Sequence, residues 1–123
     1  MNINLVAPQL RTVDLEKAIK FYTDKLGFDL AFQYEDFYAG ISFGEYVIHL
    51  KLVDSPDPSI NYVHEGKHLH LHLGVEDIQS TYDSLEKKGV TIIENISKRP
   101  WGLLEFVIAD PDGHTIYFAQ NPK

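Results

Sequence analysis

Two stretches of the chain decide the fold: DLEKAIKFYTDKLG at residues 14–27 and DIQSTYDSLEKKG at residues 77–89. Each begins with an aspartate, whose carboxylate is a favourable cap for the free N–H groups of a first helical turn. Each continues with apolar residues at helical spacing and ends on glycine, which suits the positive φ that closes a helix. The capping residues Asp14 and Asp77 are 63 positions apart, about half of the 123-residue chain. This spacing predicts a duplicated module.

Short segments rich in β-branched and aromatic residues flank both helices and indicate strands. The segment 54–67 holds two prolines with serine and asparagine, a composition typical of a linker. We therefore predict an α+β fold for a single domain of residues 1–123. It contains two βαβββ modules, about 3–53 and about 68–120, which form a cupped, barrel-like mixed sheet. The strands are expected at 4–10, 28–34, 38–43, 46–52, 68–75, 90–96, 103–109 and 115–119.

Composition narrows the classes of function. The chain has no cysteine, which excludes disulfides, thiolate metal sites and cysteine nucleophiles and favours a reducing compartment. Its net charge is -7 and its basic residues are scattered, so nucleic acid is not an expected partner. No signal-peptide pattern and no apolar run of about 20 residues occur, so we expect a cytoplasmic protein without membrane contact.

The most unusual local pattern is HLHLHL at residues 68–73. Strand alternation would place His68, His70 and His72 on one face and the three leucines on the other. We expect the leucines to pack on a helix and the imidazoles to point into the cup. These histidines suit either polar contacts at a pocket rim or a metal or substrate site, because side chains two apart on a strand project in parallel. His114 follows a turn sequence and is expected at the surface.

Four motifs, taken in order, carry a family resemblance: VDLEKA at 13–18, FY at 21–22, KLGF at 25–28 and DPDGH at 110–114. Their order and duplication resemble the vicinal-oxygen-chelate superfamily, which includes glyoxalase I, extradiol dioxygenases, and fosfomycin- and bleomycin-resistance proteins. The resemblance covers nearly the whole chain and implies the paired βαβββ fold.

Metal-dependent members of that superfamily take ligands from equivalent positions in both modules. By resemblance, these positions are Ala7 and His49 in the first module and His70 and Tyr117 in the second. Alanine offers no donor atom, and a phenol must lose a proton from a pKa near 10 to bind a divalent ion well. We therefore expect no metal and no other cofactor at the family's position, with a divalent metal as the alternative.

The bleomycin-resistance branch, whose members bind a ligand without a catalytic metal, resembles the chain more specifically. Its signatures are matched by RPWG at 99–102, EF at 105–106 and DFYAG at 36–40. Pro8 matches a proline of the first strand, where such proteins exchange N-terminal arms between two subunits. The resemblance implies a homodimer with a small-molecule ligand.

Two functions follow as hypotheses. The first is a metal-independent binding protein of the antibiotic-resistance type, which sequesters a cationic or aromatic ligand in a dimeric groove. The second is a metal-dependent lyase, isomerase or dioxygenase with a rearranged site of His49, His70 and His72. His70 and Glu105 are the candidate catalytic residues, and a metal-free enzyme with a histidine base is a further alternative. The expected ligand-binding residues are Phe32, Tyr38, His49, His70, His72, Trp101, Gly102 and Tyr117.

Overall fold

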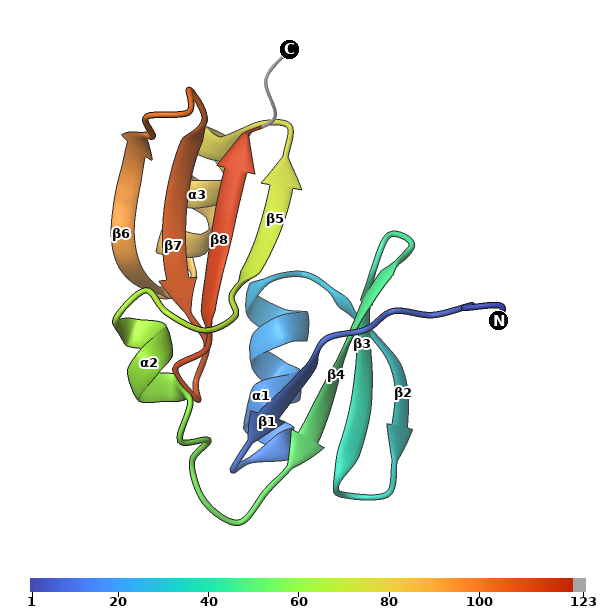
Figure 1. Cartoon of the computed structure of the whole chain (residues 1–123). Coiled ribbons are helices and arrows are strands. Elements are labelled where there is room, and N and C mark those ends of the chain that lie inside the picture. Colours follow the sequence, from blue (N-terminus) through green and yellow to red (C-terminus); the bar gives the residue numbers. More distant parts are fainter. Residues whose placement is uncertain (121–123) are drawn as a thin grey trace. The chain divides into compact units, whose positions relative to one another are not determined.

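The computed structural model describes residues 1–120, which divide into two compact units at Pro58 and Ser59 (Figure 1). This division falls inside the segment expected to be a linker. Both units repeat one order of elements and one strand order, so the predicted fold of two βαβββ modules is confirmed. Each sheet is open and four-stranded, and neither closes into a barrel by itself.

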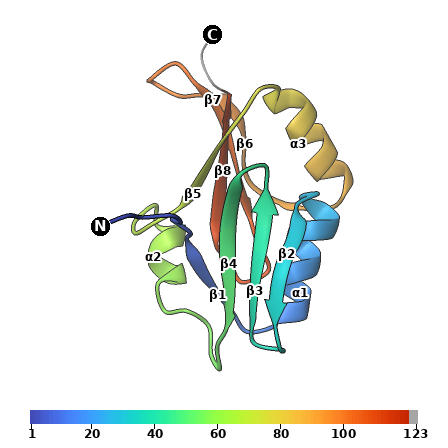
Figure 2. The same cartoon turned by 90° about the vertical axis from the view of Figure 1, so that its right-hand side faces the viewer.

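The first unit contains β1 (Gln9–Thr12), α1 (Leu15–Lys20), the π-helical turn η1 (Phe21–Lys25), β2 (Asp29–Tyr34), β3 (Tyr38–Phe43) and β4 (Tyr46–Leu52). Its strand order is β1-β4-β3-β2, with β1 and β4 parallel and the other pairs antiparallel. Helix α1 contacts β3 and β4 on one face of the sheet (Figure 2). The core between them is apolar and includes Leu15, Ala18, Tyr22, Ala39, Ile41, Ile48 and Leu50.

The second unit begins with a short helix, α2 (Ile60–His64). It continues with β5 (Leu71–Val75), α3 (Ile78–Lys87), β6 (Thr91–Lys98), β7 (Leu104–Ala109) and β8 (Thr115–Gln120). The strand order β5-β8-β7-β6 repeats that of the first unit, again with one parallel pair, β5 and β8. Helix α3 packs on one face of this sheet through Tyr82, whose ring meets Phe106 edge-on at 5.1 Å.

The predicted caps are confirmed in both helices. Asp14 accepts a hydrogen bond from the Lys17 N–H, and Asp77 accepts one from the Ser80 N–H, each at 3.1 Å. Gly27 and Gly89 follow the helices with φ of 75° and 77°, a conformation that costs a side chain-bearing residue energy. The same local chemistry therefore starts and ends the helix of each module.

Two expected strands begin later than the alternating pattern suggested. The first strand starts at Gln9 and not at residue 4. Pro8, just before it, has no N–H to donate, but its carbonyl accepts a hydrogen bond from the His49 N–H at 2.8 Å. Strand β5 starts at Leu71 and not at residue 68, because His68 has a φ of 68°, which breaks an extended backbone. As a consequence Leu69 is 81% exposed and does not pack on a helix.

The expectation that His114 lies at the surface is wrong. His114 is buried in the turn between β7 and β8. The Asp110 carboxylate accepts the backbone N–H of His114 at 2.9 Å, and the His114 carbonyl accepts the N–H of Asp110 at 2.9 Å. These two hydrogen bonds hold the turn in which His114 is buried.

No helix within residues 1–120 is long and apolar enough to cross a bilayer.

Candidate functional site

The second unit contains an open pocket of about 790 Å³ on the sheet face opposite α3. The face follows from alternation along β7, because Phe106 contacts α3 and its neighbour Glu105 therefore points to the other side. The volume lies in the usual range for small-molecule sites. We call this cavity the Trp101 pocket; it is lined by Gly66, His68, Leu69, His70, His72, Glu94, Arg99, Pro100, Trp101, Leu103, Glu105 and Tyr117.

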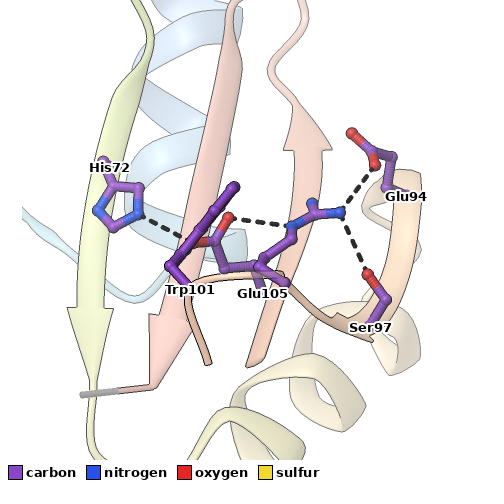
Figure 3. A network of polar contacts seen from close by, with 6 residues as sticks. His72, Glu94, Ser97, Trp101 and Glu105 are labelled. Carbon is purple, nitrogen blue, oxygen red and sulfur yellow. Dashed lines mark hydrogen bonds and ion pairs between the residues drawn. The ribbon is translucent and has the colours of Figure 1, made fainter. Parts of the chain in front are cut away.

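The central polar group of the Trp101 pocket is the Glu105 carboxylate, on β7 (Figure 3). Glu105 is only 3% exposed. Its Oε2 accepts the Trp101 indole N–H at 3.0 Å and lies 3.5 Å from His72 Nε2. Its Oε1 accepts the Arg99 Nε–H at 3.2 Å. Donors from β5 and from the β6–β7 segment therefore meet on one buried carboxylate.

These contacts decide the protonation state of Glu105. Burial by itself raises the pKa of a carboxyl group, because it disfavours the charged form. The hydrogen bonds from Trp101, Arg99 and His72 outweigh burial, so the pKa of Glu105 is lowered. Glu105 is therefore ionised at neutral pH, which is the state that anchors its donors and not the state of a general acid.

Arg99 joins the two acidic residues of the pocket. Besides its bond to Glu105, its Nη1 lies 3.4 Å from Glu94 Oε1 and donates to Ser97 Oγ at 3.2 Å (Figure 3). The Arg99 side chain is 17% exposed and the Glu94 side chain 48% exposed. One guanidinium thus faces two carboxylates, which leaves a net negative charge in the pocket while the histidines are neutral.

Three rings form the other side of the Trp101 pocket. The Tyr117 ring lies between two imidazoles: His70 meets it edge-on at 5.1 Å, and His72 stacks on it at 6.4 Å. His72 and Tyr117 are direct partners in the parallel pairing of β5 and β8. The pocket therefore combines a flat aromatic lining with the acidic group described above.

His70 carries a polar atom without a partner inside this lining. Its Nδ1 is hydrogen-bonded to Thr115 Oγ1. Its Nε2 is buried and has no hydrogen-bond partner within the described residues. A buried nitrogen without a partner costs free energy unless a ligand or water fills the role. His70 is therefore a lining residue of the pocket with one unpaired buried nitrogen.

The first unit has its own cluster at the equivalent face of its sheet. Gln9 Nε2 donates to the Tyr38 hydroxyl at 3.1 Å, and that hydroxyl is hydrogen-bonded to His49 Nδ1 at 2.9 Å. Phe32 packs edge-on against His49 at 5.4 Å and stacks with Tyr38 at 6.3 Å. The strand registers make Tyr38 the equivalent of Glu105 and His49 the equivalent of Tyr117. The cluster of the first unit, which contains no carboxylate, therefore lies at the position that Glu105 and its partners have in the second unit.

The residues expected at a ligand site thus fall into two groups. His70, His72, Trp101 and Tyr117 line the Trp101 pocket, whereas Phe32, Tyr38 and His49 form the cluster of the first unit. Gly102 is not among the lining residues and instead shapes the loop with a φ of 93°.

Sequence reasoning missed two charged residues that line the pocket, Glu94 and Arg99, and it missed Thr115, which is hydrogen-bonded to His70. Arg99 had a signal, since it precedes the Pro-Trp-Gly motif and carries a charge at the edge of a strand. Nothing in the sequence links Glu94 or Thr115 to the site.

The donor set does not favour a divalent metal. Within residues 1–120 no three His, Asp or Glu side chains come together in a geometry that could hold an ion. Of the alternative set, His49 Nδ1 is already bonded to Tyr38 and His70 Nδ1 to Thr115, so each has only Nε2 left as a possible ligand atom. The family's four ligand positions hold His49, His70, Ala7 and Tyr117. Ala7 offers no donor atom, and Tyr117 offers only a phenol.

Comparison with known proteins identifies the family. The family model of the Glyoxalase/Bleomycin resistance protein/Dioxygenase superfamily matches residues 2–118. The chain belongs to this superfamily. The resemblance seen in the sequence motifs is thereby confirmed.

Relatives within the superfamily differ in what they do. A bleomycin resistance protein of Geobacillus stearothermophilus is 30% identical over 94% of this chain and 96% of its own. A lactoylglutathione lyase of Haemophilus influenzae is 28% identical over 97% of this chain and 93% of its own. The crystal structure of a bleomycin resistance determinant encoded on the transposon Tn5 superposes with a TM-score of 0.79 at 19% identity, covering 98% of this chain and 100% of that one. Bleomycin resistance proteins and a lyase are therefore both similar to this chain over nearly its whole length.

Proposed function

We propose that this protein binds and sequesters a small cationic or aromatic molecule in the Trp101 pocket, without a catalytic metal. The observation that carries the proposal is the pairing of an exposed indole with an ionised, buried carboxylate at the edge of an aromatic pocket. Trp101 is 65% exposed, yet its N–H is bonded to Glu105. A ring held with its face free is suited to stacking on a planar ligand.

The charge and shape of the pocket support a cation. Two carboxylates, Glu94 and Glu105, face the single guanidinium of Arg99, and the aromatic rings of Trp101 and Tyr117 attract positive charge through their faces. The similarity to bleomycin resistance proteins supports the same class of ligand.

Calorimetric titration of metal-free bleomycin and of 1-methylquinolinium, a planar cation, tests the proposal. We expect an affinity that falls by about 5- to 150-fold in Trp101→Ala, because a stacked ring contributes roughly 1–3 kcal/mol. Tyr46→Ala is the matched control, since Tyr46 is an equally exposed aromatic residue (64%) in the first unit. Equal binding by the wild type and Trp101→Ala would contradict the proposed site.

The second candidate function, a metal-dependent lyase, is supported by the 28% identity to a lactoylglutathione lyase. Elemental analysis of protein purified without chelators or a histidine tag separates the two functions. Stoichiometric metal that is lost in His70→Ala, together with turnover of lactoylglutathione, would overturn the metal-free proposal. Metal well below stoichiometry and no uptake of added zinc, nickel or iron would support it.

We also infer a homodimer with an exchanged N-terminal arm near Pro8. The arm presents four exposed apolar residues, Met1, Ile3, Leu5 and Val6, which are 54–111% exposed in the single chain. Apolar surface of this kind gains free energy when a second copy covers it. Light scattering should give twice the chain mass, and Ile3→Asp/Val6→Asp should shift the protein to the monomer.

A further inference from the structure

The Glu105 carboxylate is engaged by protein side chains on both oxygens. A carboxylate offers about four acceptor positions; Trp101 Nε1 and Arg99 Nε take two of them, and His72 Nε2 lies 3.5 Å from Oε2. The group is 3% exposed, so a ligand has little access to the remaining positions. Although Glu105 faces the pocket, it is poorly placed to contact a ligand itself.

What Glu105 fixes is the orientation of its donors. The backbone of the loop is closed by two hydrogen bonds, Arg99 N–H to the Leu103 carbonyl at 2.8 Å and Gly102 N–H to the Arg99 carbonyl at 2.9 Å. These bonds hold the loop but leave the indole free to rotate about its side-chain bonds. The hydrogen bond to Glu105 is the polar contact that selects one orientation of the ring.

We propose that Glu105 is a positioning residue that holds the Trp101 indole and the Arg99 guanidinium in their binding orientation without touching the ligand. This inference rests on the proposed binding function and specifies how its site is built. It assigns direct contact with a cationic ligand to the other carboxylate, Glu94. Glu94 is 48% exposed, and its one polar contact within the described residues is to Arg99 at 3.4 Å.

Glu105→Gln and Glu94→Gln form a matched pair, because each removes one negative charge at nearly constant volume next to Arg99. A carboxamide has one acceptor oxygen, and its NH₂ group can only donate. In Glu105→Gln the one amide oxygen should stay with the charged Arg99 guanidinium, which is the stronger donor, so the NH₂ group faces the Trp101 N–H and that hydrogen bond is lost. In Glu94→Gln the half-exposed amide is solvated and Trp101 is undisturbed.

The first measurement is the near-ultraviolet circular dichroism of Trp101, which is the only tryptophan of the chain. We expect the indole bands to shrink in Glu105→Gln and to remain in Glu94→Gln and in the wild type. Unchanged bands in Glu105→Gln would overturn the inference. This readout needs no ligand, so it decides the positioning role even where the proposed function fails.

The second measurement uses two probes of the same shape, 1-methylquinolinium and neutral quinoline, titrated by calorimetry. A positioning residue affects both probes, so Glu105→Gln should weaken neutral quinoline by about tenfold, the loss expected for a charged hydrogen bond, and the cation by at least as much, because the variant also removes a negative charge. Glu94→Gln should weaken only the cation. Unchanged binding of neutral quinoline in Glu105→Gln would mean that Glu105 acts on the ligand through its charge and not through the position of Trp101, and would overturn the inference. Failure of both probes to bind the wild type would contradict the proposed function, and the circular dichroism comparison would then decide the inference.

A double-mutant cycle with Trp101→Phe closes the argument. Phenylalanine keeps a flat ring but has no N–H, so it removes the link to Glu105 at its other end. If Glu105 acts through Trp101, the Glu105→Gln change should cost far less affinity in the Trp101→Phe background than in the wild type. If the affinity losses of the two single variants simply multiply in the double variant, Glu105 does not act through Trp101 and the inference is overturned.

Discussion

Trp101 and Glu105 are joined by an indole N–H to carboxylate hydrogen bond of 3.0 Å, although the tryptophan is 65% exposed and the glutamate 3% exposed. The bond connects a ring at the surface to a charge within the sheet. Because the carboxylate also receives Arg99 and lies beside His72, its ionisation supports three side chains together. The stability of the second unit should therefore depend on this one group.

The first prediction concerns acid. The pKa of Glu105 is lower in the folded protein than its ordinary value of 4.5, because the hydrogen bonds from Trp101, Arg99 and His72 outweigh burial. Its stabilisation is therefore complete above pH 4.5 and is lost as the pH falls through the lowered folded pKa. Glu105→Gln should cost about 1–3 kcal/mol at pH 7. The difference from the wild type should shrink progressively in more acidic solution.

Urea unfolding followed by far-ultraviolet circular dichroism between pH 7 and pH 3 measures this difference. Glu94→Gln is the control, because Glu94 is half exposed and the pH dependence of its variant should follow the wild type. A gap between the wild type and Glu105→Gln that stays constant down to pH 3 would show that ionisation of Glu105 is not linked to folding.

The second prediction concerns His70 and Thr115. His70→Leu leaves the Thr115 hydroxyl, in a residue only 6% exposed, without its partner, and should cost about 1–3 kcal/mol. The double variant His70→Leu/Thr115→Val removes both polar groups together with the partnerless Nε2. It should recover most of the loss, because paired apolar replacement is nearly neutral. If ligand binding remains weak in the stable double variant, His70 is retained for recognition.

Thermal unfolding of the two variants and of Thr115→Val alone gives the comparison. Two single losses that add in the double variant would show that the His70–Thr115 bond does not couple these side chains.

The third prediction concerns the helix caps. Asp14→Ala and Asp77→Ala should each lower the free energy of unfolding by about 1 kcal/mol, because each removes the acceptor of a first-turn N–H. Asn at either position should be nearly neutral, since its side-chain oxygen serves equally well. Denaturant unfolding of the four variants tests this. Equal losses for Ala and Asn would mean that the charge, and not the hydrogen bond, is what stabilises the helices.

The caps also show why the fold could be predicted from the sequence. Helix starts, helix ends and strand alternation are local, and the chain repeats them 63 residues apart. The errors arose where backbone conformation departs from side-chain pattern. The alternation of HLHLHL continues through residues 68–70, but His68 has a φ of 68°, a conformation rare for a residue other than glycine.

The contacts of Arg99 with Glu94 and Glu105 could not be predicted for a related reason. Arg99 reaches Glu94 and Glu105 across the pairing of β6 with β7, whose register shifts twice, between Ile92 and Glu94 and between Glu94 and Ser97. A bulge changes which side chains share a face, and period-two reasoning assumes that none is present. By contrast, Tyr117 and His72 lie on regular pairing, where alternation places side chains correctly.

The last prediction concerns Gly40 in the cluster of the first unit. Gly40 pairs with Phe32 on one side and His49 on the other, and a Cβ at this position would overlap the Phe32 ring. Gly40→Ala should therefore force the ring away and cost about 1–3 kcal/mol.

In a Phe32→Ala background the ring is gone, and Gly40→Ala should change sign. It should then stabilise the protein by roughly 0.5–1 kcal/mol, because alanine loses less backbone entropy than glycine in a strand. Thermal unfolding of the wild type, the two single variants and the double variant gives the cycle. If Gly40→Ala still lowers the free energy of unfolding when Phe32 is absent, the strand and not the ring requires glycine. The packing of Phe32 on Gly40 would then not determine the position of this ring beside His49.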